Sequence, residues 1–267
     1  MLAYDENGLP TGLKSLTCST GAVADDPFTV TTTHVGTTTL KYNVTAKDAS
    51  VKYCTFATGY DYYQRWQLEE GTNGDVIKHF ISMWSTFASW YGENWQTMMK
   101  YDRREGTYEG DGYHLMWDAR QVVITFGMDD DGNLVTPIQV DSIHTNAPTP
   151  MDMDIPVTVL SNEWGDQQIK AAPTTNTPYF ITMQPAAYVD LYKTDAALLR
   201  ALCYEADNIN PTDLARTRDE DLRDGLWEFR VRKDVDTDYY IIAVGLDEGA
   251  PATRAFKTKI TVPGGSF

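Results

Sequence analysis

Histidine side chains are the first place to look for proton transfer or metal binding, and this chain has four of them, far apart in the sequence. His79 lies in a predicted helix, but the residue one helical turn later is Met83, which excludes the HExxH arrangement of a zinc protease. The chain also has no G-x-S-x-G nucleophile elbow and no glycine-rich phosphate loop. We therefore expect no catalytic residue, no metal and no cofactor, and a structural or solvent-facing role for each histidine: His34, His79, His114 and His144.

Paired carboxylates could still hydrolyse a glycosidic bond, because that reaction needs only a general acid and a nucleophile or base. Candidate side chains are Glu69, Glu70, Glu93 and Glu109. The chain is so acidic, with 38 Asp and Glu residues, that carboxylates occur along most of its length, and nothing in their spacing selects one pair. A carboxylate-based glycoside hydrolase is therefore an alternative function, and it predicts two carboxyl groups about 5–10 Å apart in a cleft.

One acidic cluster begins like a calcium-binding loop. Asp129, Asp131 and Asn133 match positions one, three and five of such a loop. The glycine and the glutamate that should follow are replaced by Leu134 and Val140. The segment is therefore predicted to be a hairpin turn rather than a metal site.

Aromatic side chains are the remaining candidates, since the chain has seven Trp and sixteen Tyr residues. The segment YDYYQRW (60–66) follows a predicted strand, and further rings lie in a predicted helix. Exposed rings can stack on sugar faces or anchor a protein partner. The candidate ligand-binding residues are Tyr62, Trp66 and Trp90. Core packing is predicted instead for three rings of the helical stripe: Trp84, Tyr91 and Trp95.

That helix is predicted over residues 74–99, where apolar residues recur at steps of three and four. Asp75 is a suitable N-cap for it. A second helical region follows much later, where Thr194 or Asp195 can cap one helix and Pro211 suits the first position of another. The stripe of the first helix consists of Ile77, Ile81, Trp84, Ala88, Tyr91, Trp95 and Met98.

Charge and cysteine usage narrow the class of protein. A formal net charge of −16 repels phosphate backbones, so no nucleic acid partner is expected. Three cysteines cannot form a disulfide framework, and Cys54 and Cys203 are predicted core residues, whereas Cys18 has no apolar run before it. No window approaches the roughly 18 apolar residues of a membrane span. The N-terminal segment shows no signal peptide, which leaves a cytoplasmic protein or a chain that begins after a removed leader.

A phrase that occurs twice indicates how the chain is organised. VVITFGMDDDG (122–132) and YIIAVGLDEG (240–249) both run from an apolar strand through Gly into an acidic turn. Flanking segments match in the same order, and we infer a tandem duplication from them. The matching segments are 34–56 with 163–183, 109–117 with 222–229, and 142–150 with 255–263.

Short runs rich in β-branched residues, separated by turn signals, predict a mainly β fold with helical insertions, built from two tandem β-sandwich modules. A leader segment covers residues 1–26. Module one covers 27–146, with its helical insertion at about 74–100. Module two covers 147–267, with its insertion at about 194–224.

The strand pattern also resembles a known family. FTVTTTHVGTTTLKYNVTAKDASVKYCTF (28–56), an apolar strand ending in FGMDDDG, and then SIHTNAP are similar to the fibronectin type III-like, Ig-like modules of Bacteroidota surface lipoproteins. The resemblance covers both modules but not the helical insertions. It implies an export signal and a lipid-attachment cysteine outside this chain, and a location at the cell surface, anchored in the outer membrane, or in the periplasm.

Together these observations predict a non-catalytic, exported binding module of the cell surface that recognises a glycan or a surface protein. Contact with a membrane would be made only through a lipid anchor absent from this chain. A structural stalk of a surface assembly is a further alternative, and it predicts a sizeable flat apolar patch rather than a cleft. The glycan hypothesis requires an exposed aromatic patch.

Overall fold

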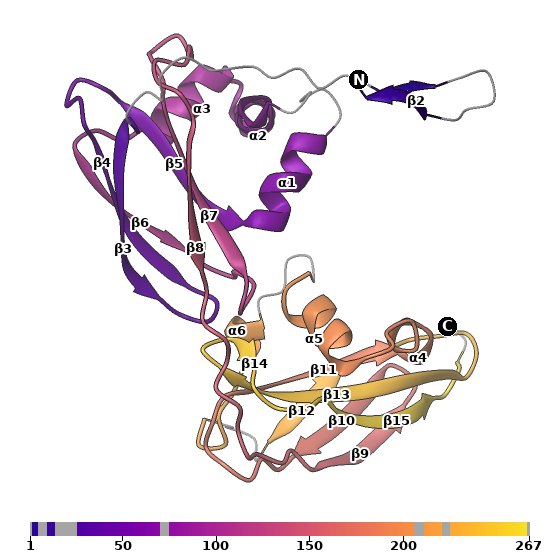
Figure 1. The fold of residues 1–267 in the computed structure, drawn as a ribbon. Coiled ribbons are helices and arrows are strands. Elements are labelled where there is room, and N and C mark those ends of the chain that lie inside the picture. Colours follow the sequence, from indigo (N-terminus) through magenta and orange to yellow (C-terminus); the bar gives the residue numbers. More distant parts are fainter. Residues whose placement is uncertain are drawn as a thin grey trace.

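The computed structural model describes residues 2–4, 10–13, 26–69, 75–205, 211–220 and 225–265. Strands dominate, and helices are inserted between them, as the sequence predicts (Figure 1). Near the N-terminus, β1 (Leu2–Tyr4) pairs antiparallel with β2 (Pro10–Leu13). Cys18 and Glu70 lie outside the described residues. The strands from β3 onwards form two sandwiches, and no strand of one pairs with a strand of the other among the described residues.

Module one has two antiparallel sheets, with strand orders β3–β4–β6 and β5–β7–β8. Leu40, Tyr42 and Val44 alternate into the space between the sheets, as predicted, and meet Phe28 and Tyr53 there. The strand bounds are β3 (Phe28–Val35), β4 (Leu40–Ala46), β5 (Tyr53–Gly59), β6 (Thr107–Gly112), β7 (Arg120–Gly127) and β8 (Gln139–His144).

Module two repeats this arrangement, with orders β9–β10–β12 and β11–β13–β15. Ile169, Tyr179 and Ile241 belong to the core between its sheets. The strand bounds are β9 (Val157–Glu163), β10 (Asp166–Ala171), β11 (Tyr179–Pro185), β12 (Leu226–Phe229), β13 (Thr237–Asp247), β14 (Ala250–Pro251) and β15 (Phe256–Val262). The short β14 pairs with the end of β13.

The strand order identifies the fold. When the two-residue β14 is left out of the count, strands one, two and four of each module form one sheet, and strands three, five and six form the other. This is the A-B-E and C-F-G division of an Ig-type sandwich, with helices and no strand D among the described residues of the connection between C and E. The chain therefore carries two tandem fibronectin type III-like modules with helical insertions. Where one module ends and the other begins stays a prediction, because residues 145–156 connect them without regular structure.

The duplication is visible in individual hydrogen bonds. The first residue of the third strand faces the glycine of the repeated phrase, and the same residue forms a β-bridge to an arginine. The glycine N–H donates to a threonine Oγ1 at 2.8 Å in module one and 2.9 Å in module two. The equivalent residues are Tyr53 and Tyr179, Gly127 and Gly245, Arg104 and Arg216, and Thr136 and Thr253.

Helices cover the outer face of the C-F-G sheet in both modules. Phe80 and Trp84 pack against Phe126 of β7, and Leu198 packs against Ile242 of β13. The central strand is thus buried on both faces, which explains its continuous apolar run. The helix bounds are α1 (Tyr60–Leu68), α2 (Val76–Tyr91), α3 (Trp95–Asp102), α4 (Ala186–Val189), α5 (Asp195–Cys203) and α6 (Pro211–Leu214).

The predicted helix starts are confirmed. Asp75 accepts a hydrogen bond from Ile77 N at 3.0 Å, and Thr194 Oγ1 accepts one from Ala197 N at 3.2 Å. Helix α6 begins at Pro211. Sequence reasoning missed α1, because YDYYQRW has no apolar residue at helical spacing beyond its rings. None of the helices in the described ranges is long and apolar enough to cross a membrane.

The prediction of one continuous stripe over 74–99 was wrong. Gly92 adopts φ +69° and ends α2, and Asn94 then caps α3. Trp84 is only 1% exposed and its core assignment is confirmed. Trp95 is partly buried against that core. Tyr91 does not pack in the core, because it is the last residue of α2 and its side chain is 73% exposed.

Both described cysteines lie in the core, as predicted. Cys54 packs in the cluster beneath α2, and Cys203, the last residue of α5, packs in the cluster between α5 and its sheet. Burial raises the pKa of each thiol to about 12. The thiols are therefore protonated and unreactive at neutral pH.

Candidate functional site

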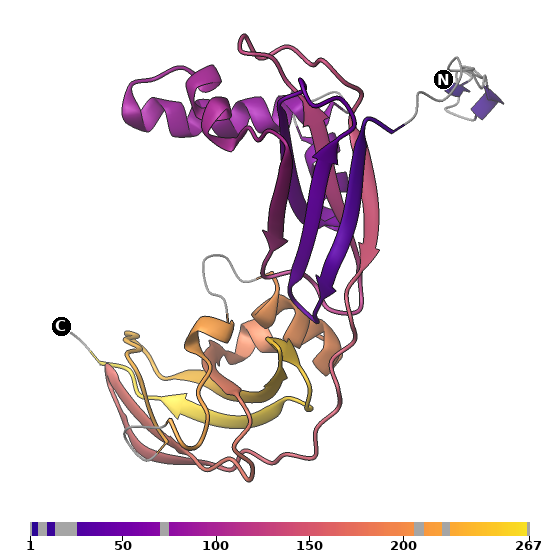
Figure 2. The same ribbon diagram turned by 90° about the vertical axis from the view of Figure 1, so that its left-hand side faces the viewer.

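The turn that joins α2 to α3 carries aromatic side chains that the core does not use. Phe87 is 40% exposed, Trp90 68%, and Tyr91 and Tyr101 each 73%. The α2 and α3 helices lie to one side of the module-one sandwich and project beyond it (Figure 2). We call this surface the helical corner, and it consists of Phe87, Trp90, Tyr91, Glu93, Met98 and Tyr101.

Local sequence fixes the shape of the corner. Gly92 adopts the left-handed conformation that most residues avoid, and its N–H donates to the Ala88 carbonyl. Asn94 Oδ1 then accepts from Thr97 N at 2.9 Å and from Thr97 Oγ1 at 3.1 Å. One helix is thus capped, and the next begins, within three residues, so the rings on both sides have defined positions.

The corner is also tied to the core. Trp84 Nε1 donates to Asp102 Oδ2 at 2.7 Å and joins the end of α3 to the middle of α2. The Trp84 and Trp95 rings stack with centroids 6.2 Å apart. Because α3 is held through its first and last residues, the exposed rings stand on a supported element rather than on a free loop.

A groove lies between the two helices at this corner. Its lining residues are Tyr91, Glu93, Met98 and Tyr101, and its volume is about 520 Å³. Met98 is partly buried against the helix–sheet core. Beside the groove, the Phe87 and Trp90 rings form an edge-to-face pair with centroids 5.2 Å apart. The groove therefore combines apolar surface with two hydroxyl groups and one carboxylate.

Of the three predicted ligand-binding residues, only Trp90 belongs to the helical corner. Trp66 of α1 stacks on His79 at 4.2 Å and meets Phe80 edge-on, so its ring is engaged within module one. Tyr62 meets the Tyr204 ring of module two edge-on at 5.7 Å. These two residues thus lie in intramolecular contacts, and their role as ligand-binding residues stays a prediction.

Sequence reasoning missed most of the corner. The sequence pattern predicts Tyr91 as a core residue and Glu93 only as a candidate catalytic carboxylate, and it does not indicate Phe87, Met98 or Tyr101 as ligand residues. The signal that could have found them is the GEN segment (92–94), because Gly and Asn after an apolar stripe end one helix and start another. Rings that flank such a break lie at helix ends.

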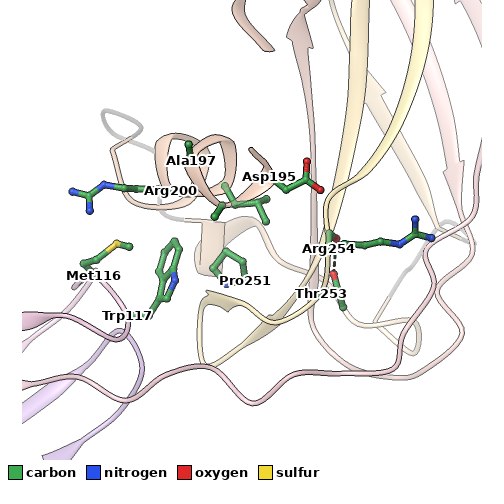
Figure 3. Close-up of a pocket in the computed structure, with 10 residues that line it drawn as sticks. Met116, Trp117, Asp195, Ala197, Arg200, Pro251, Thr253 and Arg254 are labelled. Atoms are coloured by element: carbon green, nitrogen blue, oxygen red, sulfur yellow. Dashed lines mark hydrogen bonds between the residues drawn. The ribbon is translucent and has the colours of Figure 1, made fainter. Parts of the chain in front are cut away.

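A second cavity lies where the two modules meet (Figure 3). Its volume is about 510 Å³. Met116 and Trp117 of module one face residues of α5 and of the segment around β14 in module two. The acidic and basic side chains at its rim are engaged elsewhere, since Asp195 pairs with Lys257 at 2.7 Å and Arg200 pairs with Glu205 at 2.9 Å.

Hydrogen bonds join the modules beside this cavity. Asp61 of α1 accepts from Tyr204 Oη at 3.0 Å and from Arg200 Nη2 at 3.0 Å. His114 Nε2 donates to the Tyr204 carbonyl at 3.0 Å. Burial, followed by the Asp61 charge, raises the pKa of Tyr204 above its usual value. The phenol therefore remains a proton donor to Asp61.

A second contact joins the β3–β4 turn to the turn after β13. Thr37 Oγ1 donates to the carbonyl of Asp247 at 3.0 Å and to that of Glu248 at 2.9 Å, while Thr38 Oγ1 donates to Glu248 O at 2.7 Å. Thr37 is buried there. The modules thus contact each other at two separate places.

The connecting segment 145–156 is itself bonded to both modules. Asn146 N donates to the Gly36 carbonyl at 3.0 Å, and Thr149 N donates to Asp247 Oδ2 at 2.7 Å. Further along, Met151 N donates to the Ala252 carbonyl at 2.9 Å. The connecting segment is therefore hydrogen-bonded to the surface of module one at its start and to the surface of module two further along.

The carboxylates weighed for glycoside hydrolysis lie on different elements. Glu69 pairs with His79 at 2.7 Å at the end of α1, and Glu93 lies in the helical corner. Glu109 shares a polar cavity of about 310 Å³ with Asp111 on the outer face of β6. Both of those carboxylates are exposed, whereas the general acid of a glycosidase is desolvated in a pocket.

The acidic turn 129–133 is built by its own side chains. Asp129 Oδ1 accepts from Asp131 N at 3.0 Å and from Asn133 N at 2.8 Å, as in the predicted hairpin turn. Hydrogen bonds from Asn133 lower the pKa of Asp129. In the part of the chain that the structure describes, no three His, Cys, Asp or Glu side chains gather to hold a metal ion.

No protein-family model matches the chain, and no curated protein matches it. Among solved structures, it is similar to the FN1-FN3 domains of chicken CNTN1, with 10% identity and a TM-score of 0.27, over 88% of this chain and 66% of that one. It thus spans just under two thirds of that structure. It is also similar to a two-domain fibronectin type III segment of chicken tenascin, with 7% identity and a TM-score of 0.27, over 89% of this chain and 99% of that one. The strand order of the chain itself is what identifies its modules as fibronectin type III-like.

Proposed function

We propose that the chain is a non-catalytic binding protein of the cell surface, which recognises a glycan or a surface protein with its helical corner. The observation that carries this proposal is the group of exposed rings on a capped, core-anchored helix pair. Contiguous exposed apolar groups of this kind mark interaction sites. A rigid support lowers the entropy lost when a ligand binds.

The resemblance to modules of Bacteroidota surface lipoproteins supports the location. We propose export to the cell envelope, with attachment through a lipid anchor outside this chain. The net charge of −16 disfavours nucleic acid as a ligand. A binding function suits this arrangement, because the β-sandwich keeps its strands fixed while the insertion that carries the exposed rings can vary.

The test measures binding of the chain to solubilised envelope from a Bacteroidota bacterium on a biosensor, together with a broad glycan array. We expect Trp90→Ala to weaken binding about 10-fold or more. Tyr113→Ala is the matched control, because Tyr113 is an exposed ring of module one outside the corner. Equal binding by the wild-type chain and the Trp90→Ala variant would contradict the proposal.

Treating the envelope beforehand separates the two ligand classes. Periodate cleaves sugars with neighbouring hydroxyls, and proteinase K removes surface proteins. A glycan ligand predicts loss of binding after periodate only. A protein ligand predicts loss after proteinase K only.

One observation favours a structural role as a second candidate. The modules are joined at two contacts and along their connecting segment, so the chain can act as a spacer of constant length. A pure spacer would keep its function in cells when Trp90 is replaced by Ala and lose it when the inter-module contacts are broken.

A further inference from the structure

We propose that the groove of the helical corner, lined by Tyr91, Glu93, Met98 and Tyr101, is a sugar-binding site for a neutral or amino-bearing pyranose. This inference rests on the proposed function and names the ligand of the same surface. It differs from that function in committing to one ligand class and to one group of residues.

The first support is that the groove rings are not engaged elsewhere. In the described part of module one, Trp66 stacks on His79, and Trp84 stacks on Trp95. Tyr91 and Tyr101 have no such ring partner among the described residues, and each is 73% exposed. Open ring faces of this kind offer flat apolar area at little entropy cost, which suits the C–H face of a pyranose.

The second support is the polar lining. Among the described residues, the hydroxyls of Tyr91 and Tyr101 and the carboxylate of Glu93 form no hydrogen bond or ion pair with another side chain or backbone group. A carboxylate accepts from two neighbouring hydroxyls at once, and a phenol both donates and accepts. These groups match a ring that presents hydroxyls at its edge and C–H bonds on its face.

Charge then selects within the class of sugars. Among the described residues that line the groove, Glu93 is the one with a charged side chain. A negatively charged sugar such as a uronic acid would meet this carboxylate at short range, where like charges repel. An ammonium group on the sugar would pair with it. The groove is therefore suited to neutral and amino sugars rather than to acidic ones.

Size and rigidity fit as well. A volume of about 520 Å³ falls in the usual range of small-ligand sites, about 300–1,000 Å³. Tyr91 ends one capped helix, and Tyr101 lies next to Asp102, which is fixed by Trp84. The backbone positions that carry the two rings are thus fixed before a ligand arrives.

The experiment titrates the full chain with methyl glucoside, N-acetylglucosamine, glucosamine and glucuronate, and follows amide shifts by NMR. We expect shifts centred on residues 91–101 for the first three sugars. Glucuronate should bind with an affinity at least about 10-fold lower than theirs. Tyr91→Ala and Tyr101→Ala should each lower affinity about 10-fold, and Tyr101→Phe only a few-fold, because the ring stays. Glu93→Gln should reduce the discrimination against glucuronate. Tyr113→Ala should change nothing.

The outcomes separate this inference from the proposed function. Envelope binding that depends on Trp90, with no sugar shifting the groove amides, overturns the sugar site and leaves the binding function intact. Envelope binding abolished by proteinase K alone also overturns it. Envelope binding that no corner variant alters overturns both proposals. Intact amide spectra of the variants exclude misfolding as the cause of lost affinity.

Discussion

The two modules have the same strands but use their insertions differently. In module one, α2 is sixteen residues long, covers the sheet, and extends beyond it to expose the helical corner. In module two, α5 is nine residues long, and its last turn contacts α1 of module one through Arg200. One insertion thus leaves aromatic side chains exposed, while the other contacts the neighbouring module. The two insertions stand on the same scaffold, so the difference between them lies in the length of each insertion and in what its last turn contacts.

The largest effect is expected where the module-one insertion meets its sheet. Trp84→Ala removes a fully buried indole and its hydrogen bond to Asp102, and should lower the free energy of unfolding by about 3–5 kcal/mol. Urea denaturation followed by circular dichroism measures this. A loss below about 1 kcal/mol would show that α2 is not a structural part of the module.

The two buried cysteines can report each module separately. Losing about 3 kcal/mol locally should raise the labelling rate of Cys54 by a thiol reagent about 100-fold in the Trp84→Ala variant, because opening exposes the thiol. Labelling of Cys203 should stay unchanged, since it lies in the module-two core. Mass spectrometry of the labelled peptides, with Cys18→Ser as background, distinguishes the sites. Equal acceleration at both cysteines would mean that the modules unfold as one unit.

The contact between the β3–β4 turn and module two should have an intermediate effect. Thr37→Val keeps the shape of the side chain and removes a hydroxyl that donates to two carbonyls. The free energy of the contact between the modules should become about 1–2 kcal/mol less favourable. The exposed Thr29→Val on β3 is the control. Small-angle X-ray scattering should show a wider range of inter-module distances for the Thr37 variant only. Identical scattering curves would mean that this contact does not hold the modules.

The Asp61 contact should contribute less, because the carboxylate of Asp61 and the guanidinium of Arg200 are both partly exposed to solvent, which weakens their interaction. A double-mutant cycle of Asp61→Asn and Tyr204→Phe should give a coupling of about 0.5–1 kcal/mol. The measurement is again urea denaturation. Additive effects of the two substitutions would remove this hydrogen bond from the forces that join the modules.

The smallest effect on stability is expected at the helical corner. Trp90→Ala should change the free energy of unfolding by less than about 0.5 kcal/mol, since its side chain is 68% exposed. A ligand site that is neutral for stability is consistent with the proposed division of roles. A loss comparable with that of Trp84→Ala would instead assign Trp90 to the core.

The architecture could be predicted because it depends on short-range sequence signals, and because these signals occur in both modules. Strand alternation and the paired glycines Gly127 and Gly245 each constrain a short stretch of chain, and their repetition in the same order favours a duplicated module. The cap at Asp75 is equally local. These signals need no knowledge of which distant residues meet.

The helical corner and the inter-module contacts could not be predicted in the same way. Tyr91 satisfies the periodicity of the buried stripe, but periodicity does not say where the sheet beneath the helix ends. Asp61 and Tyr204 are 143 residues apart, and nothing in the sequence around either residue indicates that the two side chains form a hydrogen bond. The sequence does not reveal that Trp66 stacks on His79, because the two residues lie on different helices, thirteen positions apart.

The bonded connection between the modules has a mechanical consequence. A flexible tether lets two attached units search for their ligands over a range of distances, and the effective concentration follows the length of the tether. Here Asn146, Thr149 and Met151 fasten the connection to folded surfaces on both sides. The distance between the two modules is therefore expected to vary little. Two such chains on one surface would present their corners at the same height, so the spacing of ligands, rather than the slack of a linker, would decide whether both can bind at once.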